Sequence, residues 1–325
     1  MICFEIAREN VSEISPNLSL RKNPEKNQLN TKYKNIWGAL IIFVGAICFS
    51  SKAVIVKLAY NFNIDSVSLL ALRMLFSLPF FLGAFAYSSL KEKPSPIEKN
   101  DWLFLIVLGL MGYYLASYFD FKGLEFITAS LERLILFIYP TLVVLLSAAI
   151  YKKKITRNEI IALLLTYSGI AVVFLNDLKF DQKNVITGGL LIFGSALTYS
   201  FYLVGSGKLI PKIGAVRYNS ISMIVSTLIV LIHYLLSAED SLFHYDWQVY
   251  ALSVFMAIVA TVIPSFLLAE GIRLIGAGKA SIIGSVGPVS TIILANIFLK
   301  EEITLLQILG TVFVLAGVLL VSKSK

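Results

Sequence analysis

The sequence predicts an all-α integral membrane protein with ten transmembrane helices, arranged as two inverted five-helix repeats. Three observations support this fold class. The chain of 325 residues is 57% hydrophobic and only 15% charged, with a mean hydropathy of +0.80, which is outside the range of ordinary soluble domains. Ten apolar windows are long enough to cross a bilayer, and the two halves of the chain resemble each other.

The ten apolar windows give the expected order of spans. A helix of about 20 residues crosses the hydrocarbon core of a bilayer. Trp37, Trp102 and Trp247 stand at the first residues of three windows, where an amphipathic ring favours the headgroup region, and they support those boundaries. The windows cover residues 36–58, 66–88, 102–119, 127–150, 159–175, 186–206, 219–237, 247–269, 278–298 and 304–321.

The net charge of +8 follows from membrane topology, and we expect no nucleic-acid partner. If the amino terminus is cytoplasmic, the inner segments hold twenty lysine and arginine residues and the outer connections only four. This bias indicates that both termini of a multi-pass protein are cytoplasmic. Residues 1–35 lack the apolar core of a secretory signal peptide, so we expect a disordered cytoplasmic tail there.

An internal duplication is visible at an offset of 148 residues. The 51 residues that start at Gly123 align without a gap with those that start at Gly271, and twelve positions are identical. The matched prolines and glycines are harder to obtain by chance in apolar sequence than matched leucines. The identical pairs include Gly123 with Gly271, Pro140 with Pro288, Ile155 with Ile303, Thr156 with Thr304, and Gly169 with Gly317.

The duplication predicts two domains, residues 36–177 and 186–323, each with five spans. An odd number of spans makes the second repeat enter the membrane with the opposite orientation. Inverted repeats of this kind form two similar bundles that rock about a site near the midplane and expose it to each side in turn.

Two stretches carry a family resemblance. "SSKAVIVKLAY" (50–60) followed by "SLLALRMLF" (68–76), and "ASLERLILFIYPTLVVLLSAAIYKKKIT" echoed by "ASIIGSVGPVSTIILANIFLKEEIT", resemble EamA-type repeats of the ten-helix branch of the drug/metabolite transporter superfamily. The resemblance covers residues 36–323 and implies a transporter of small organic solutes with a central cavity between the halves. In prokaryotes it implies an inner-membrane exporter. The family handles amino acids, metabolites and toxic compounds, and its motifs do not encode which.

Several charged residues lie inside the predicted spans, where a charge near the bilayer centre costs about 2.5–3.5 kcal/mol. At a rise of about 1.5 Å per residue, Lys52, Arg73 and Glu132 all lie on the order of 8–10 Å below the outer surface. We therefore expect an outer polar vestibule, net positive, that attracts a carboxylate or another anionic group. It would hold Lys52, Arg73, Glu132 and Arg133, with Asp120 at its edge.

A purely structural interpretation of these charges is about as well supported. Lys52 and Lys57 would extend to the interface, and Arg73 would form a structural pair with Glu132. The first spans of the two repeats match at an offset of 150 residues, at which Tyr202 corresponds to Lys52. At the offset of 148, Ala280 and Ser281 correspond to Glu132 and Arg133. A charged site would therefore belong to the first repeat alone.

Pro140 and Pro288 lie near the middle of the fourth and ninth spans. Because proline lacks an N–H, the carbonyls of Leu136 and Gly284 lose their intrahelical donors, and each helix can kink. The alternative to a functional hinge is a tolerated kink. The matched positions in the two repeats favour a hinge at each proline.

Tyrosines and serines extend the candidate site along two helix faces. A spacing of three or four residues places Ser195, Tyr199 and Tyr202 on one face of the sixth span, and Tyr113 and Ser117 on one face of the third. Lining of a cavity and polar packing between helices explain these faces equally well. The candidate substrate-binding residues are Lys52, Arg73, Tyr113, Ser117, Glu132, Arg133, Tyr199 and Tyr202.

The sequence offers no catalytic, cofactor or metal-binding pattern. "GSGKL" (205–209) lacks the glycine and the Ser or Thr of a phosphate-binding loop. The two histidines, His233 and His244, fall on different segments, and Cys3 and Cys48 are too few for a thiolate site. We expect no enzyme, no cofactor and no metal ion. The expected partners are a small-molecule solute and the lipid bilayer.

Two forms of transport remain open on the sequence. One is a secondary transporter, favoured as an exporter, that is coupled to protons or to a counter-solute. The other is an uncoupled facilitator or an uptake carrier for a small organic anion. Glu132 is the best candidate proton carrier, because an apolar environment favours a neutral carboxyl, although Arg73 and Arg133 oppose this. A membrane-embedded sensor without transport is a remote alternative, and the sequence leaves the oligomeric state open.

Overall fold

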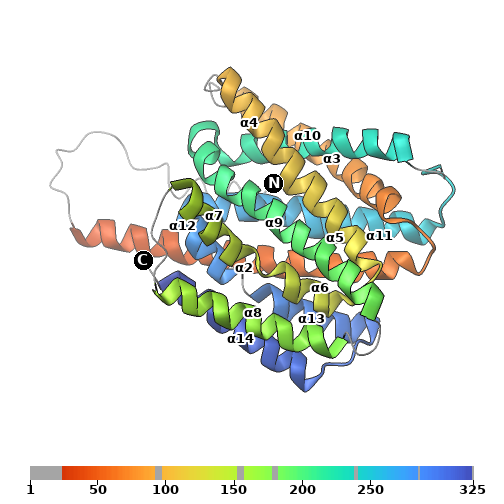
Figure 1. Cartoon of the computed structure of the whole chain (residues 1–325). Coiled ribbons are helices and arrows are strands. Elements are labelled where there is room, and N and C mark those ends of the chain that lie inside the picture. Colours follow the sequence, from red (N-terminus) through yellow and green to blue (C-terminus); the bar gives the residue numbers. More distant parts are fainter. Residues whose placement is uncertain are drawn as a thin grey trace.

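The computed structural model describes residues 24–91, 97–151, 157–177, 182–237, 241–284 and 286–323. These residues form a bundle of helices that run back and forth along one main direction (Figure 1). Seven helical stretches are long and apolar enough to cross a membrane, and Val286–Leu299 and Leu305–Gly317 are shorter apolar helices. The predicted all-helical membrane fold is confirmed.

The first repeat contains five spans, two of which are divided. The third span is divided into three helical segments and the fourth into two. The elements are α2 (Pro24–Tyr60), α3 (Ser66–Lys91), α4 (Lys99–Gly109), η1 (Leu110–Leu115), α5 (Ala116–Leu124), α6 (Ala129–Leu136), α7 (Tyr139–Tyr151) and α8 (Arg157–Asp177). The sequence predicts a disordered tail over residues 1–35, but α2 begins at Pro24, so residues 24–35 form the first turns of this helix. Residues 1–23 lie outside the described residues.

The second repeat repeats this order. Within α12 the chain turns at Gly276, whose φ of 81° favours glycine, so the eighth span ends there and the ninth begins. The elements are α9 (Gln182–Ile213), α10 (Ala215–Ser237), α11 (Trp247–Ala257), η2 (Ile258–Val262), α12 (Ile263–Ile283), α13 (Val286–Leu299) and α14 (Leu305–Lys323). In Figure 1, α2 begins and α14 ends at the left of the bundle, which we call the terminal end; the opposite end is the distal end.

The contacts between helices follow an exchange of the two repeats. The first span, α2, packs against α12 and α13, while its counterpart α9 packs against α5 and α7. Two helices, α3 and α8, pack against their own counterparts, α10 and α14. Glycines allow matched close approaches, because Gly123 faces Gly188 and Gly271 faces Gly38 across these helix pairs. The repeats are thus related by a pseudo-twofold, as the inverted duplication predicts.

The outward faces of the bundle are apolar. Leu164 on α8, Leu190 on α9 and Ile297 on α13 are each more than 60% exposed. Apolar side chains in these positions face the lipid of a membrane, whereas many serine and threonine side chains are buried between helices. The polar groups of the protein are therefore concentrated inside the bundle.

Candidate functional site

The third and eighth spans contain π-helical segments at matched positions. η1 starts at Leu110 and η2 at Ile258, which are separated by the duplication offset of 148 residues. A π turn widens the helix and redirects the side chains that it carries. Tyr113 and Thr261 occupy equivalent positions in the two segments, and the Thr261 hydroxyl donates to the Met256 carbonyl oxygen five residues earlier (3.0 Å).

The fourth and ninth spans are both interrupted near their middle. α6 ends at Leu136 and α7 starts at Tyr139, while α12 ends at Ile283 and α13 starts at Val286. Pro140 and Pro288 lie in the first turns of α7 and α13, where a missing N–H removes no helical hydrogen bond. The sequence predicts a kink at each proline. In the structure one helix ends before the proline, and a second half-helix contains the proline in its first turn.

Five ionisable side chains form a buried group toward the distal end, which we call the charged cluster. They come from α2, α3, α5 and α6, and each is at most 8% exposed. Lys52 Nζ lies 2.5 Å from Asp120 Oδ2, so Lys52 forms a buried ion pair and does not extend to the interface. The members are Lys52, Arg73, Asp120, Glu132 and Arg133.

Glu132 and Asp120 form a pair of carboxyls within this cluster. Glu132 is fully buried, and its side chain is adjacent to that of Asp120. No donor among the described residues is aligned for a hydrogen bond to either Glu132 oxygen. A buried carboxylate without donors is costly, whereas a protonated carboxyl can donate to a neighbouring oxygen. The pair can hold one proton without breaking the contact between Lys52 and Asp120.

Arg73 is held firmly across the two repeats. Its Nε donates to Thr261 Oγ1 (2.8 Å) and its Nη1 to Ser117 Oγ (3.4 Å). The guanidinium lies 5.3 Å from the centre of the Phe121 ring, a cation–π contact. No ion pair between Arg73 and Glu132, the structural alternative predicted above, occurs among the described residues; Arg73 instead bonds to the second repeat.

Arg133 is held much less firmly than Arg73. Its Nη2 donates one long hydrogen bond of 3.5 Å to Ser50 Oγ, and its buried Nε has no described partner. The guanidinium lies beside Gly287 on α13 and within electrostatic reach of Tyr139 and Tyr199. Arg133 therefore keeps donors that are free to bind another group.

Five tyrosines from both repeats form a continuous tyrosine wall. Tyr202 is its centre: it stacks on Tyr199 (5.8 Å between ring centroids, 22°) and meets Tyr113 edge to face (5.0 Å, 62°). Tyr139 meets Tyr199 edge to face at 5.4 Å. The Tyr113 hydroxyl donates to Asn219 Oδ1 (3.0 Å) and accepts from Tyr202 (3.3 Å). The wall consists of Tyr113, Tyr139, Tyr199, Tyr202 and Tyr218.

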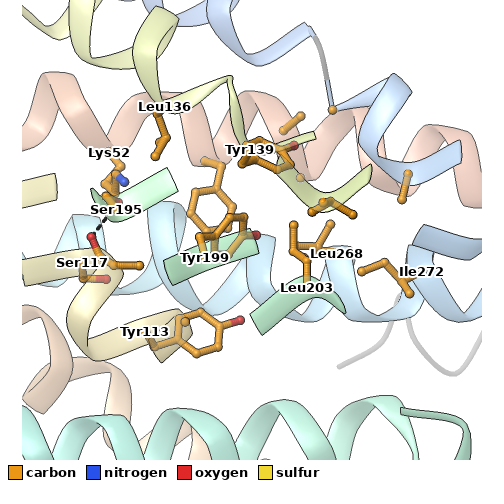
Figure 2. Close-up of a pocket in the computed structure, with 18 of the residues that line it drawn as sticks. Lys52, Tyr113, Ser117, Leu136, Tyr139, Ser195, Tyr199, Leu203, Leu268 and Ile272 are labelled. Carbon is orange, nitrogen blue, oxygen red and sulfur yellow. Dashed lines mark hydrogen bonds between the residues drawn. The ribbon is translucent and has the colours of Figure 1, made fainter. Parts of the chain in front are cut away.

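A cavity of about 110 Å³ lies between the repeats. A buried water needs roughly 10–15 Å³ on the same measure, so the cavity holds on the order of eight waters or one small organic molecule. Figure 2 shows Lys52 and Ser117 gathered on one side, Leu268 and Ile272 on the other, and Tyr199 between them. One side of the cavity is thus cationic and polar, and the other is apolar.

Most of the predicted site residues line this cavity. Glu132 and Tyr202 do not: Glu132 packs beside Asp120, and Tyr202 lies within the tyrosine wall. Ala280, the counterpart of Glu132, lines the cavity from the ninth span. The predicted residues that do line it are Lys52, Arg73, Tyr113, Ser117, Arg133 and Tyr199.

Sequence reasoning missed three residues of the second repeat that support the site. Thr261 binds Arg73, Asn219 binds Tyr113, and Tyr218 stacks on Tyr202. Asn219 carries the one available signal, since an amide in an apolar span needs a buried hydrogen-bond partner. Thr261 carries none, because its role depends on the π-helical segment.

Comparisons with known proteins agree with this architecture. The model of the EamA-like transporter family matches residues 36–175 and 186–323. The uncharacterized transporter YcbK of Bacillus subtilis (strain 168) is 30% identical over 288 residues, which cover 86% of this chain and 92% of YcbK. The uncharacterized inner membrane transporter YicL of Salmonella typhimurium is 25% identical over 291 residues, covering 88% of this chain and 95% of YicL.

A solved crystal structure has the same fold. It superposes with a TM-score of 0.63 at 17% sequence identity and covers 87% of this chain and 96% of its own. The two family matches coincide with the two inverted repeats, between which the cavity lies. The chain is therefore a multi-pass membrane transporter and belongs to the EamA-like transporter family of the drug/metabolite transporter superfamily.

Proposed function

We propose that the protein is a secondary transporter that exports a small organic solute across the cytoplasmic membrane by alternating access. The observation that carries this proposal is the central cavity, which both repeats line at their interrupted helices. A site at the interface of two inverted repeats is exposed to either side when one repeat rocks against the other. Pro140 and Pro288 lie in the first turns of the half-helices that would change direction during this movement.

The distribution of charge supports an orientation of the protein in the membrane. The twenty lysine and arginine residues on the segments expected to be inner favour a cytoplasmic position for the terminal end. Ile42, Leu203 and Ile272 carry the cavity lining from the midplane toward that end, whereas the charged cluster lies toward the distal end. In this orientation the aliphatic side of the cavity lies nearer the cytoplasm than the charged cluster does.

Efflux from proteoliposomes tests transport before the solute has been identified. Vesicles containing the purified protein are loaded with a mixture of amino acids, organic acids and nucleosides, and the retained solutes are measured by mass spectrometry. We expect one chemical class to leave these vesicles and to stay in protein-free vesicles. If all solutes are retained in both, the protein does not transport them, and the sensor alternative is favoured.

We further propose that the Asp120–Glu132 pair couples export to protons. Lys52 and Arg133 are the nearest cations to Glu132, and the positive charge of Arg73 attracts the Asp120 carboxylate. A carboxyl pair that holds one proton can release it when the site opens to the other side. Wild-type efflux should then change with the pH gradient, and Glu132→Gln should transport at a rate independent of it. Wild-type efflux that ignores the gradient would support an uncoupled facilitator.

A further inference from the structure

The charges that face the cavity are all positive. Lys52, Arg73 and Arg133 line it, whereas Asp120 and Glu132 of the same cluster do not. A solute in the cavity therefore meets three cationic side chains, and the two carboxyls stand behind them. The described lining residues include no aspartate or glutamate.

The charged cluster also has a net positive charge. It contains three cations and two carboxyls, so at least one positive charge remains even when both carboxyls are ionised. A buried charge without a partner is unfavourable, and a proton bound by Glu132 would raise the surplus to two. A single anionic group in the cavity would remove most of this penalty.

Among the described residues of the charged cluster, Arg133 has hydrogen-bond donors that are not used. Its Nε is buried without a described partner, and its Nη2 reaches only a hydroxyl at 3.5 Å. A guanidinium presents Nε–H and Nη–H in a fork that fits the two oxygens of a carboxylate. Arg73 lies on the same side of the cavity but already donates to Thr261 and Ser117.

The remainder of the lining suits an apolar body and no ammonium group. Val143, Leu203, Leu268 and Ile272 supply aliphatic surface, and Tyr199 presents a ring between them and the charged cluster. An ammonium group would lie among cations with no carboxylate to pair with. The described lining residues therefore offer an ammonium group no carboxylate partner.

We propose that the cavity binds a monocarboxylate with an apolar body and without an ammonium group, and that Arg133 is the main residue that binds the carboxylate. Lys52 and Arg73 add attraction, and the body lies along the tyrosine wall toward the aliphatic side. This inference rests on the proposed function, since it names the solute class of the same cavity. The inferred solute is an organic acid and not an amino acid, which is another class that the family handles.

Three probes that share a phenylethyl body test the proposal by direct binding. Isothermal titration of the purified full-length protein compares 3-phenylpropanoate, phenylalanine and 2-phenylethylamine, which carry a carboxylate, both groups and an ammonium. We expect 3-phenylpropanoate to bind about tenfold or more tighter than phenylalanine, and 2-phenylethylamine not to bind, because each unpaired buried charge costs at least one charge-assisted hydrogen bond. Tighter binding of the amine, or no carboxylate binding at millimolar concentration, overturns the proposal.

Substitution of Arg133 tests the residue assignment. Arg133→Gln should weaken 3-phenylpropanoate binding about 10- to 100-fold, and Arg133→Lys should weaken it less, because a lysine keeps the charge and loses the fork. Arg157→Gln, at an exposed position on α8, is the matched control and should bind like the wild type. Thermal unfolding verifies that each variant is folded. A folded Arg133→Gln protein with wild-type affinity overturns the assignment.

The experiments distinguish a failure of the inferred solute class from a failure of the transport proposal. A protein that binds 3-phenylpropanoate but moves no solute in the efflux assay retains the inferred solute class and loses the transport proposal. A protein that releases only amines or amino acids from the loaded vesicles remains a transporter and loses the inferred class.

Discussion

The two repeats share the same irregularities of the backbone and differ in their charged side chains. Each has a π-helical segment in its third span and an interrupted helix in its fourth. The π-helical segments start 148 residues apart, and the interruptions lie within one residue of the same offset. All five members of the charged cluster belong to the first repeat. At matched positions the second repeat has Tyr202 for Lys52 and Ala280 for Glu132.

This difference indicates what each feature is for. A movement about a pseudo-twofold needs the same flexible points in both halves, so the interruptions and π-helical segments occur twice. Recognition of one solute needs a single set of charges, so one copy is enough. The second repeat still contributes to the charged side, because Thr261 in its π-helical segment binds Arg73.

The largest expected difference between the repeats comes from the matched positions 52 and 202. Lys52→Met leaves Asp120 and Glu132 without their nearest cation, and loss of one partner of a buried ion pair costs about 3–5 kcal/mol. Tyr202→Phe removes only one hydroxyl and should cost about 1 kcal/mol. Thermal unfolding in detergent measures both. Equal losses of unfolding free energy would show that the buried ion pair stabilises the protein no more than one hydroxyl group does. The double variant Lys52→Met/Asp120→Asn should recover part of the stability that Lys52→Met loses.

The second-largest expected difference in stability concerns the matched positions 112 and 260. Gly112 in η1 lies against Tyr202, and an added Cβ would overlap the ring and its Cβ, which belong to a tightly packed wall. The equivalent Ala260 in η2 already carries a Cβ and is buried. Gly112→Ala should therefore cost about 1–3 kcal/mol in thermal unfolding.

Gly83 on α3 provides the control for this substitution, since nothing lies within 4 Å of an added Cβ there. Gly83→Ala should be neutral or slightly stabilising, because alanine favours a helix. A Gly112→Ala protein as stable as Gly83→Ala would contradict the close packing of η1 on the tyrosine wall.

The two prolines should have small effects on stability and parallel effects on rate. Pro140 and Pro288 occupy first turns, so Pro140→Ala and Pro288→Ala should each change the unfolding free energy by less than about 1 kcal/mol. If both act as hinges, each variant should lower the efflux rate several-fold and leave 3-phenylpropanoate affinity unchanged. A loss of rate in Pro140→Ala alone would confine the hinge to the charged repeat, and unchanged rates in both would remove the hinge.

The sequence predicts the fold well because the relevant signals are local or periodic. Apolar windows locate the spans, and the duplication locates the inverted repeats and the matched prolines. The partners within the charged cluster are not predictable in this way. Lys52 and Asp120 are 68 residues apart, and three cations with two carboxyls allow several pairings that only the packing of α2 on α5 and α6 resolves.

The π-helical segments have no sequence signature here. "LMGYYL" at 110–115 and "IVATV" at 258–262 share no residue pattern, although the backbone is widened at the same place in both. Their consequence, the position of Thr261 beside Arg73, was therefore missed, whereas the cationic lining was predicted from depth in the membrane alone.

The last comparison concerns a contact by which the second repeat holds the charged repeat. Glu301, after α13, accepts hydrogen bonds from Ala129 N (2.9 Å), Ser130 N (3.1 Å) and Ser130 Oγ (2.6 Å) at the start of α6. A carboxylate at a helix amino terminus stabilises it electrostatically, and the amide oxygen introduced by Glu301→Gln would accept without the charge, so the cost should be about 1 kcal/mol. Because α6 carries Arg133, 3-phenylpropanoate affinity should fall a few-fold as well. Glu302→Gln, at the exposed neighbouring position, should change neither quantity, and identical behaviour of the two variants would mean that the contact of Glu301 does not position the charged repeat.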